Sequence, residues 1–256
     1  MKIEFHYTYL IVAISFILTG HFANLLIFTS IIIVHELGHF IIAKINSLNV
    51  EKMIIYPYGG MVKMNNPINI KINTELLVSI SGILFQIIYY IIVYYLYQKG
   101  IMREYIFNLY KTYNDSMLVF NLLPIHPLDG SKILNLLLSK VLPFNIANKL
   151  NIIISIVTLI IVVSIQYYNF NYTTILIIGI ILDNITKYYR QLKYIFNKFL
   201  LERYLYKLTY TKTKTIDKIT HMYKENYHII KEKQQYITEK QALTHKFKGK
   251  IWKIFD

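Results

Sequence analysis

The sequence predicts an all-α integral membrane protein with six transmembrane helices, and two observations support this fold class. Of the 256 residues, 55% are hydrophobic and only 16% are charged, which is too apolar for an ordinary soluble domain. Several segments also approach the roughly 20 apolar residues that a helix needs to cross a bilayer. The chain contains no cysteine, so disulfide frameworks, cysteine metal sites and thiol nucleophiles are excluded.

The six predicted spans differ in how well they meet this length. Three of them come close to it: Asn24–Lys44, Leu76–Tyr97 and Ile152–Tyr168. Two are marginal: Phe5–Phe22 and the stretch that runs from Tyr172 through Leu182 into DNITKYY. The sixth, Ser116–Ser139, is interrupted by Pro124 and Pro127. The first 23 residues lack a basic region and a cleavage pattern, so we expect them to form a retained first helix.

The distribution of basic residues orients these spans, because Lys and Arg concentrate in cytoplasmic loops. One set of loops holds Lys44, Lys52, Lys63, Lys71, Lys132, Lys140 and Lys149, whereas the other set holds Lys99, Arg103 and Lys111. We therefore expect both termini in the cytoplasm. From Lys187 onward there are 17 basic and 6 acidic residues, which accounts for +11 of the net charge of +14. A basic end after a span indicates contact with anionic lipid, and without a recognised motif we expect no nucleic-acid binding.

The segment NVEKMIIYPYGGMVKMN, between the second and third spans, predicts a small β-hairpin at the cytoplasmic face. Its side chains alternate from Val50 to Tyr56 before a proline and a glycine pair. One interpretation is a connecting turn without a further role. The other is an exposed strand edge, to which an extended peptide could add main-chain hydrogen bonds.

We place the membrane domain at residues 1–199 and a basic cytoplasmic C-terminal segment at residues 200–256, called the tail below. The tail is short for an independent domain. It shows Lys/Thr alternation in TKTKTIDK and a helical pattern from Ile216 to Gln235.

Residues 31–43, IIIVHELGHFIIA, place two histidines and a glutamate inside an apolar span. Each ionisable group at this depth costs about 2.5–3.5 kcal/mol on insertion scales, so such groups tend to mark a functional site. His35 and His39 lie four residues apart and return to one helix face, which is the HExxH spacing of a zinc site. Glu36 then lies beside the metal as a candidate general base. In the alternative interpretation, hydrogen bonds in the bundle core satisfy both histidines.

A catalytic zinc ion takes a third protein ligand and keeps an open position for water. The candidate is Asp129 in NLLPIHPLDGSK, since no other acidic residue lies between Asp115 and Asp183. Broken helices at membrane depth are tolerated where the freed backbone lines a cavity or packs on protein. The alternative role for Asp129 is that of a helix N-cap.

The combination of HELGH in one span with LDG after a proline-broken later span resembles the site-2 protease family of intramembrane zinc metalloproteases, peptidase family M50. The stretches TGH, PYGG, NLLPIxPLDG and FLLERY resemble the sporulation branch of that family. The resemblance covers residues 1–205. It implies one zinc ion per chain, bound by His35, His39 and Asp129, with Glu36 as the catalytic base.

The resemblance also implies roles outside the metal site. Asn121 in NLLP corresponds to a residue that helps to position the substrate, and we expect the same role for Tyr58, Gly59 and Gly60 of PYGG and for Pro127. The implied substrate is a membrane-tethered sigma-factor precursor, cleaved at the mother-cell membrane around the forespore. Membrane-bound inhibitory proteins are possible partners.

Several features depart from the family pattern, among them Ser131, which stands where a second glycine is common in relatives. The third span reads SISGILFQ instead of carrying a Gly-Pro pair, although Ser79 and Gly82 still offer a small face for close packing on the helix that carries Gly38. His126 stands where relatives carry Asn, and we expect it to have a turn or supporting role. The family's nucleotide-responsive CBS domain is at most a short remnant in this tail.

Two other functional classes fit a polar membrane core. The first is a catalytically silent scaffold of the same fold, which loss of Glu36 or Asp129 would favour; both residues are present. The second is a metal or small-solute transporter, for which an internal repeat is expected and none is seen. The sequence leaves the oligomeric state, the cleavage site and ATP binding open.

Overall fold

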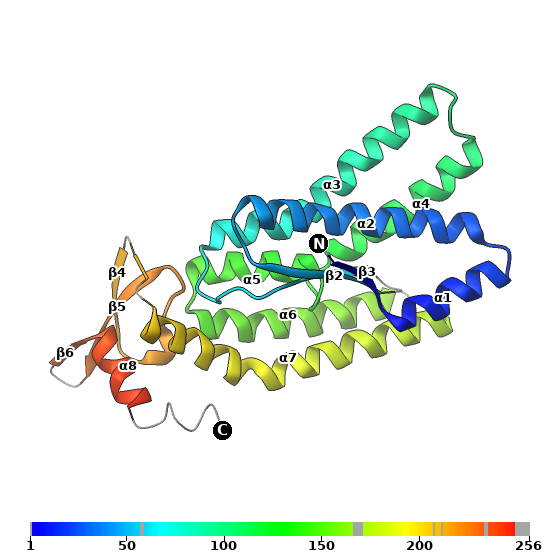
Figure 1. Ribbon diagram of the computed structural model, residues 1–256. Helices are drawn as coiled ribbons and strands as arrows, with labels where there is room; N and C mark the ends of the chain where they lie inside the picture. Colours follow the sequence, from blue (N-terminus) through cyan, green and yellow to red (C-terminus); the bar gives the residue numbers. More distant parts are fainter. Residues whose placement is uncertain are drawn as a thin grey trace. The chain divides into compact units, whose positions relative to one another are not determined.

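The computed structural model describes residues 2–56, 59–165, 171–206, 208–210, 212–232 and 235–248. These residues are mostly helical (Figure 1). The chain divides into two compact units. The first unit comprises Met1–Asn66 and Leu76–Leu123, and the second comprises Pro67–Glu75 and Pro124–Asp256.

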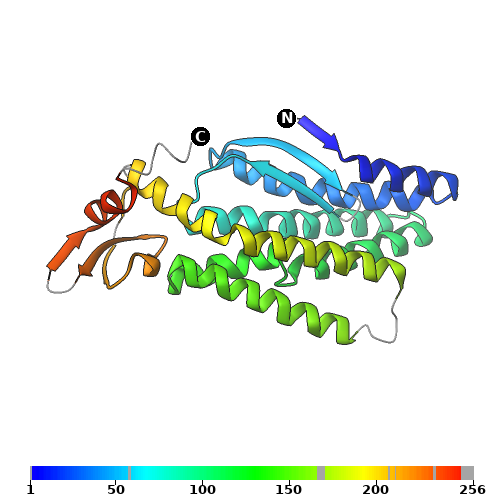
Figure 2. The same cartoon turned by 90° about the horizontal axis from the view of Figure 1, so that it is seen from below.

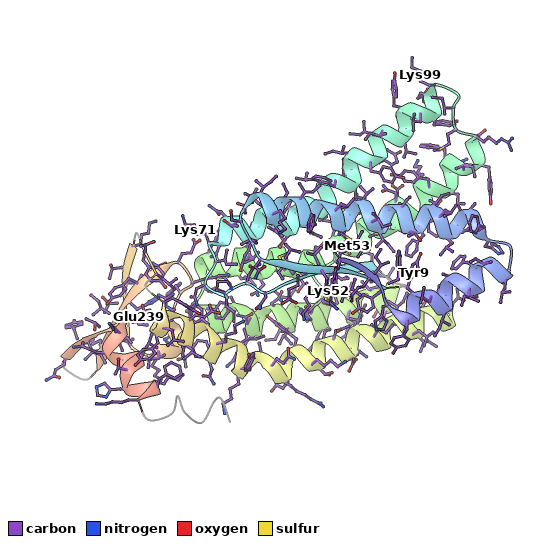
Figure 3. The ribbon with its side chains drawn as sticks, in the orientation of Figure 1. Tyr9, Lys52, Met53, Lys71, Lys99 and Glu239 are labelled. Atoms are coloured by element: carbon purple, nitrogen blue, oxygen red, sulfur yellow. The ribbon has the colours of Figure 1, made fainter. Side chains whose placement is uncertain are left out.

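The helices of the first unit are α1 (Tyr7–Leu18), α2 (Phe22–Ile45), α3 (Ile72–Gln98) and α4 (Glu104–Leu122), the first turn of α3 belonging to the second unit. Helices α1 and α2 are joined by a turn at Gly20, and α3 and α4 by a turn at Gly100; both glycines have positive φ angles, 75° and 70°, which glycine adopts without steric cost. Lys99 marks the second turn in Figure 3. The core of the unit is apolar and rich in aromatic rings, and includes Ile31, Ile32, Ile55, Phe107 and Tyr110.

A three-stranded sheet belongs to the same unit, in the order β1 (Lys2–Phe5), β2 (Val50–Tyr56) and β3 (Gly59–Met64). Strand β1 pairs parallel with β2, and β2 pairs antiparallel with β3. Met53 and Ile55 are fully buried on one face of β2, as the alternating sequence predicts. Helix α2 contacts both β2 and β3, and Figure 2 shows these two strands running along the helix.

The second unit contains α5 (Asp129–Val141), α6 (Phe144–Ile165) and α7 (Tyr172–Leu205), with α6 packed against both of the others. A second three-stranded sheet follows, formed by β4 (Lys212–Ile216), β5 (Asn226–Glu232) and β6 (Gln235–Thr238). A short 3-10 helix, η2 (Ile219–His221), lies between β4 and β5, and α8 (Glu239–Phe247) ends the described chain. Thr238 and Gln241 form a capping box that begins α8.

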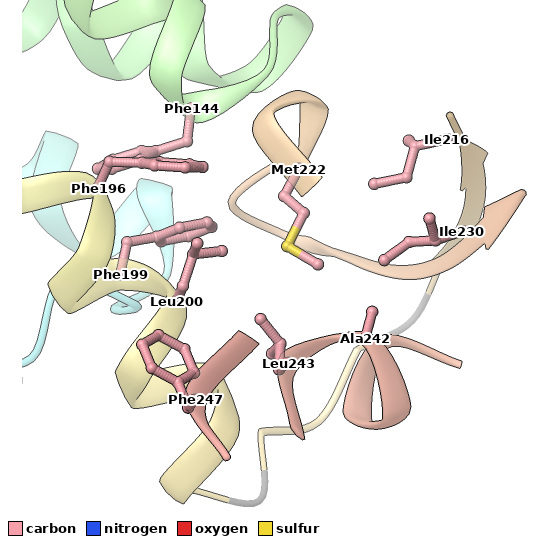
Figure 4. Packing of buried hydrophobic residues seen from close by; sticks show 10 residues of the cluster. All are labelled: Phe144, Phe196, Phe199, Leu200, Ile216, Met222, Ile230, Ala242, Leu243 and Phe247. Atoms are coloured by element: carbon pink, nitrogen blue, oxygen red, sulfur yellow. The ribbon is translucent and has the colours of Figure 1, made fainter. Parts of the chain in front are cut away.

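The tail has its own apolar core with the end of α7 (Figure 4). Phe199 and Leu200 of α7 are fully buried there, together with Met222 and Leu243 from the tail. Figure 4 shows Met222 between the α7 residues and the strand residue Ile230. Because these side chains cluster around α7, the tail is packed onto the end of this helix.

Buried charges strengthen this junction. Arg203 of α7 forms an ion pair with Glu239 at 2.6 Å and donates to three backbone carbonyls of the tail. His228 Nδ1 lies 3.0 Å from the same glutamate. Burial lowers the pKa of His228; burial alone would raise the pKa of Glu239, but hydrogen bonds from His228 and Arg203 outweigh it and lower the value. The folded tail therefore favours a neutral His228 beside an ionised Glu239.

The neighbouring Glu202 ties α7 to the segment that leads into α3. Its carboxylate accepts hydrogen bonds from the backbone N–H groups of Ile68 and Asn69 at 2.7–3.0 Å. Lys224 of the tail also forms an ion pair with Glu75, in the first turn of α3. The FLLERY stretch thus carries two consecutive anchoring residues, Glu202 and Arg203.

Several sequence-based expectations need correction. The fold is mostly helical but not all-α, since the tail carries a sheet: the period-2 Lys/Thr pattern forms β4, and the helix expected over Ile216–Gln235 is wrong. The N-terminal helix begins at Tyr7, because residues 2–5 pair with β2 instead. The broken span expected over Ser116–Ser139 consists of two separate helices, α4 and α5, with the proline segment between them.

Among the described residues, three helices are long and apolar enough to cross a membrane: α2, α3 and α6. Helix α1 has 12 residues, and α4 carries Glu104, Lys111 and Asp115. A count of six spans, the cytoplasmic side of the first sheet, the location of the termini and the domain boundary after residue 199 stay predictions.

Candidate metal centre

Helix α2 brings His35, Glu36 and His39 together. Their candidate ligand atoms all lie within 4.8 Å of one another, and the three side chains are 2–6% exposed. The helical spacing of four residues explains the pairing of the histidines, whose ring centroids are 4.9 Å apart at an angle of 81°. The sequence-based expectation of a clustered HExxH group on a helix agrees with this geometry.

The two imidazole rings direct their Nε2 atoms toward each other. Their Nε2 atoms lie 3.2 Å apart. His39 Nδ1 is 2.7 Å from the backbone carbonyl of Val78, and His35 Nδ1 is 3.1 Å from the side-chain carbonyl of Gln86. Since a carbonyl oxygen only accepts, each Nδ1 carries the proton in the neutral ring and each Nε2 keeps its lone pair.

This donor set fits a zinc ion. Two neutral imidazole Nε2 atoms that face each other, each held through Nδ1–H by an oxygen, form the arrangement that histidine ligands of zinc adopt. With the protons of both neutral rings on Nδ1, the two Nε2 atoms 3.2 Å apart each offer a lone pair that one cation between them can accept. The carboxylate of Glu36 adds a group of opposite charge beside the same point.

Close backbone contacts shape the surroundings of the centre. A Cβ atom added to Gly38 of α2 would lie 2.5 Å from the backbone carbonyl oxygen of Ser81 on α3, which confirms the expected close helix contact. A Cβ atom on Gly82 would collide with the Nε2 atoms of both histidines. One on Gly60 of β3 would collide with the side chain of Glu36. Gly82 thus leaves room for the two candidate metal ligands, His35 and His39, and Gly60 leaves room for Glu36, the candidate general base.

Asp129 belongs to the second unit, where it is the first residue of α5 and is 5% exposed. The N-cap position is occupied by Leu128, so Asp129 is not the N-cap residue of this helix. Lys132 Nζ lies 2.8 Å from its Oδ1 atom. His126, three residues earlier, stacks on Tyr188 with 4.2 Å between ring centroids, and its backbone N–H donates to Ser155. The segment before Asp129 is therefore held by contacts to α6 and α7.

The remaining predicted residues lie at the ends of elements. Asn121 is half-buried, one residue before the end of α4, and Pro127 is half-buried between α4 and α5. Gly59 and Gly60 begin β3, and Tyr58 lies outside the described residues. Sequence reasoning missed Gln86 as a functional candidate, although a polar residue in an apolar span four positions after Gly82 could have indicated it.

Comparison with known proteins agrees with this geometry. Residues 23–112 match peptidase family M50. Stage IV sporulation protein FB of Bacillus subtilis (strain 168) is 34% identical over 238 residues, which cover 88% of this chain and 81% of that protein. Zinc metalloprotease MJ0392 of Methanocaldococcus jannaschii is 30% identical over 154 residues, 55% of this chain and 43% of that protein. The solved structure of the site-2 protease from Methanocaldococcus jannaschii matches with a TM-score of 0.56 and 25% identity, over 72% of this chain and 89% of that chain.

Apolar helices of membrane-spanning length, a buried HExxH group and the site-2 protease fold together define a metalloendopeptidase of the membrane. Identity to stage IV sporulation protein FB over most of both chains makes the family assignment specific. This chain belongs to peptidase family M50, and its cofactor is zinc.

Proposed function

We propose that this protein is an intramembrane endopeptidase in which His35, His39 and Asp129 hold one zinc ion and Glu36 is the general base. The observation that carries the proposal is the pair of Nε2 atoms 3.2 Å apart, with each Nδ1 bonded to a carbonyl oxygen. A metal site accounts for this pair and for the adjacent carboxylate. The core-histidine alternative accounts for the two hydrogen bonds, but it gives no role to the convergence of both Nε2 atoms and the Glu36 carboxylate on one point.

The side chains of the centre divide the chemistry of peptide hydrolysis between them. When bound, zinc polarises the scissile carbonyl and makes water a stronger acid. Glu36, 4% exposed and separated from bulk water, takes a proton from the attacking water and returns it to the leaving amine. His35 and His39 stay fixed in direction, since their Nδ1–H groups are held by Gln86 and Val78.

The sheet of the first unit suggests how a substrate reaches Glu36. Strand β1 occupies one side of β2, and β3, which lies on the other side, is an edge of the sheet. Gly60 of β3 abuts the Glu36 side chain. An extended peptide that pairs with β3 would therefore run past the catalytic base. Such a peptide must first unwind, because a helix hides its carbonyl groups in its own hydrogen bonds.

The relationship to a sporulation protein supports a proposal for the substrate class. We propose a membrane-tethered sigma-factor precursor, cleaved at the mother-cell membrane around the forespore, with both termini of the protease in the cytoplasm. Asn121, Tyr58, Gly59, Gly60 and Pro127 are proposed to position this substrate. We also propose membrane-bound inhibitory proteins as partners.

Co-expression with a membrane-tethered sigma-factor precursor tests the proposal. Glu36→Gln should reduce precursor cleavage by about 10²- to 10⁴-fold, the range for loss of a general acid–base group, with zinc retained. Asp129→Asn should reduce both cleavage and zinc content. Asp183→Asn is the matched control, because the carboxylate of this exposed aspartate on α7 forms an ion pair with solvent-facing Lys187, and the variant should cleave like wild type. Equal processing by the Glu36, Asp129 and control variants would refute the assignment.

A further inference from the structure

Gln86 is a polar side chain buried in α3, one of the helices that are long and apolar enough to cross a membrane. It is 0% exposed, whereas α3 otherwise presents residues such as Ile87, Ile88 and Ile91 that are 41–59% exposed. Burying an amide without hydrogen bonds costs several kcal/mol in an apolar environment. A buried glutamine in this helix therefore needs partners for both ends of its amide.

Both ends of the Gln86 amide form hydrogen bonds, and together these two contacts determine the orientation of the amide. The Nε2 group donates to the backbone carbonyl of Asn114 on α4 at 2.9 Å. Because that carbonyl can only accept, the NH₂ end must face Asn114, and the Oε1 atom must face His35. Oε1 then accepts from His35 Nδ1 at 3.1 Å. The backbone of α4 thus sets the orientation of Gln86, and Gln86 sets the tautomer of His35.

The two candidate ligands differ in how they are held. His39 is held by the backbone carbonyl of Val78, which no substitution of a side chain removes. His35 is held by a side chain. A substitution of Gln86 can therefore remove the hydrogen bond that holds His35, so the contribution of this hydrogen bond can be measured directly.

We propose that Gln86 is a positioning residue for metal binding, which keeps the proton of His35 on Nδ1 and its Nε2 lone pair directed at the zinc ion. This inference rests on the proposed function, in which His35 is a zinc ligand. Partners of this kind orient metal-binding histidines, and their loss typically costs 10- to 100-fold in metal affinity. Gln86 touches neither substrate nor metal in this scheme and acts through His35.

Two substitutions separate positioning from packing. Gln86→Met keeps the length of the side chain but removes the acceptor, and Gln86→Glu keeps the acceptor but places an oxygen against the Asn114 carbonyl. If Gln86 positions His35, the Met variant binds zinc more weakly than the Glu variant. If Gln86 only fills space, the apolar Met variant is tolerated and the buried charge of the Glu variant is disruptive, so the order is reversed.

The experiment measures zinc affinity of the detergent-solubilised full chain by competition with a chromophoric chelator. We expect Gln86→Met to bind zinc 10- to 100-fold more weakly than wild type, and Gln86→Glu to lie between the two. Gln98→Met is the matched control on the same helix, since Gln98 is exposed and bonds to Tyr94, and it should bind like wild type. Wild-type affinity in Gln86→Met, or the reversed order, overturns the inference.

A further variant separates this inference from the proposed function. His35→Ala should abolish high-affinity zinc binding. If His35→Ala binds zinc like wild type, the proposed metal site is wrong. If His35→Ala loses zinc while Gln86→Met keeps it, the metal site stands and the role of Gln86 is wrong. Should Gln86→Met not fold, Gln86→Asn replaces it with the same expected loss, because its amide is one methylene too short to reach both partners.

Discussion

Gly82 gives the sharpest test of how α3 shapes the metal centre. A Cβ atom at this position would lie 2.6 Å from His39 Cε1 and 2.7 Å from His35 Nε2, which is about 0.7–0.8 Å short of the 3.4 Å of ordinary contact. Gly82→Ala therefore forces both imidazoles away from their present positions. Overpacking of this kind costs about 1–3 kcal/mol, and if the cost falls on the metal-bound state it lowers zinc affinity by about 5- to 150-fold.

The assay is the zinc competition titration with Gly82→Ala beside Gly179→Ala. A Cβ atom on Gly179 of α7 meets nothing within 4 Å, so this control makes the same chemical change in open space. The control should bind zinc like wild type and should be slightly more stable, because alanine favours a helix over glycine. Wild-type zinc affinity in Gly82→Ala would refute the reasoning, since a methyl group cannot share this space with both rings.

Three further predictions concern the edge strand and the tail. Neighbouring N–H groups of β3 point to opposite sides, so one of Met61→Pro and Val62→Pro removes an outward donor and should slow precursor cleavage while zinc is retained; unchanged cleavage in both would exclude pairing at this edge. Arg203→Met leaves Glu239 buried without its ion-pair partner and should destabilise the tail by about 3–5 kcal/mol in native-state hydrogen exchange; no change would show that the pair is unimportant. The tail should also lose stability as the pH falls below about 6.5, because the unfolded His228 takes up a proton that the folded one resists, and further below about 4.5, where the unfolded Glu239 is protonated. Hydrogen exchange corrected for intrinsic rates measures this, and constant stability between about pH 8 and pH 4 would contradict the lowered pKa values.

Helix α2 and its HExxH group could be predicted from the sequence because the patterns that indicate them are local. An apolar run fixes α2, and the spacing of His35 and His39 fixes their common face. The alternation in β2 is local in the same way. These elements need no information about distant parts of the chain.

The elements that the sequence analysis missed depend on partners far along the chain. Residues 2–5 form β1 because they pair with β2, which lies about 50 residues later in the chain. From the sequence alone, Phe5 cannot be told from the apolar residues of the helix that follows it. Helix α4 carries charges typical of a loop but buries Phe107 and Tyr110 in the aromatic core. Gln86 gains its meaning from His35 and the Asn114 carbonyl, on two other helices.

The proposed zinc ligands are His35, His39 and Asp129. Anomalous diffraction from the zinc-loaded protein, with data collected at the zinc absorption edge, tests this ligand set most directly. We expect one peak per chain, about 2.0–2.2 Å from the Nε2 atoms of both histidines and from a carboxylate oxygen of Asp129. A zinc peak away from the histidines, or one that Asp129 does not reach while it stays paired with Lys132, would contradict this ligand set.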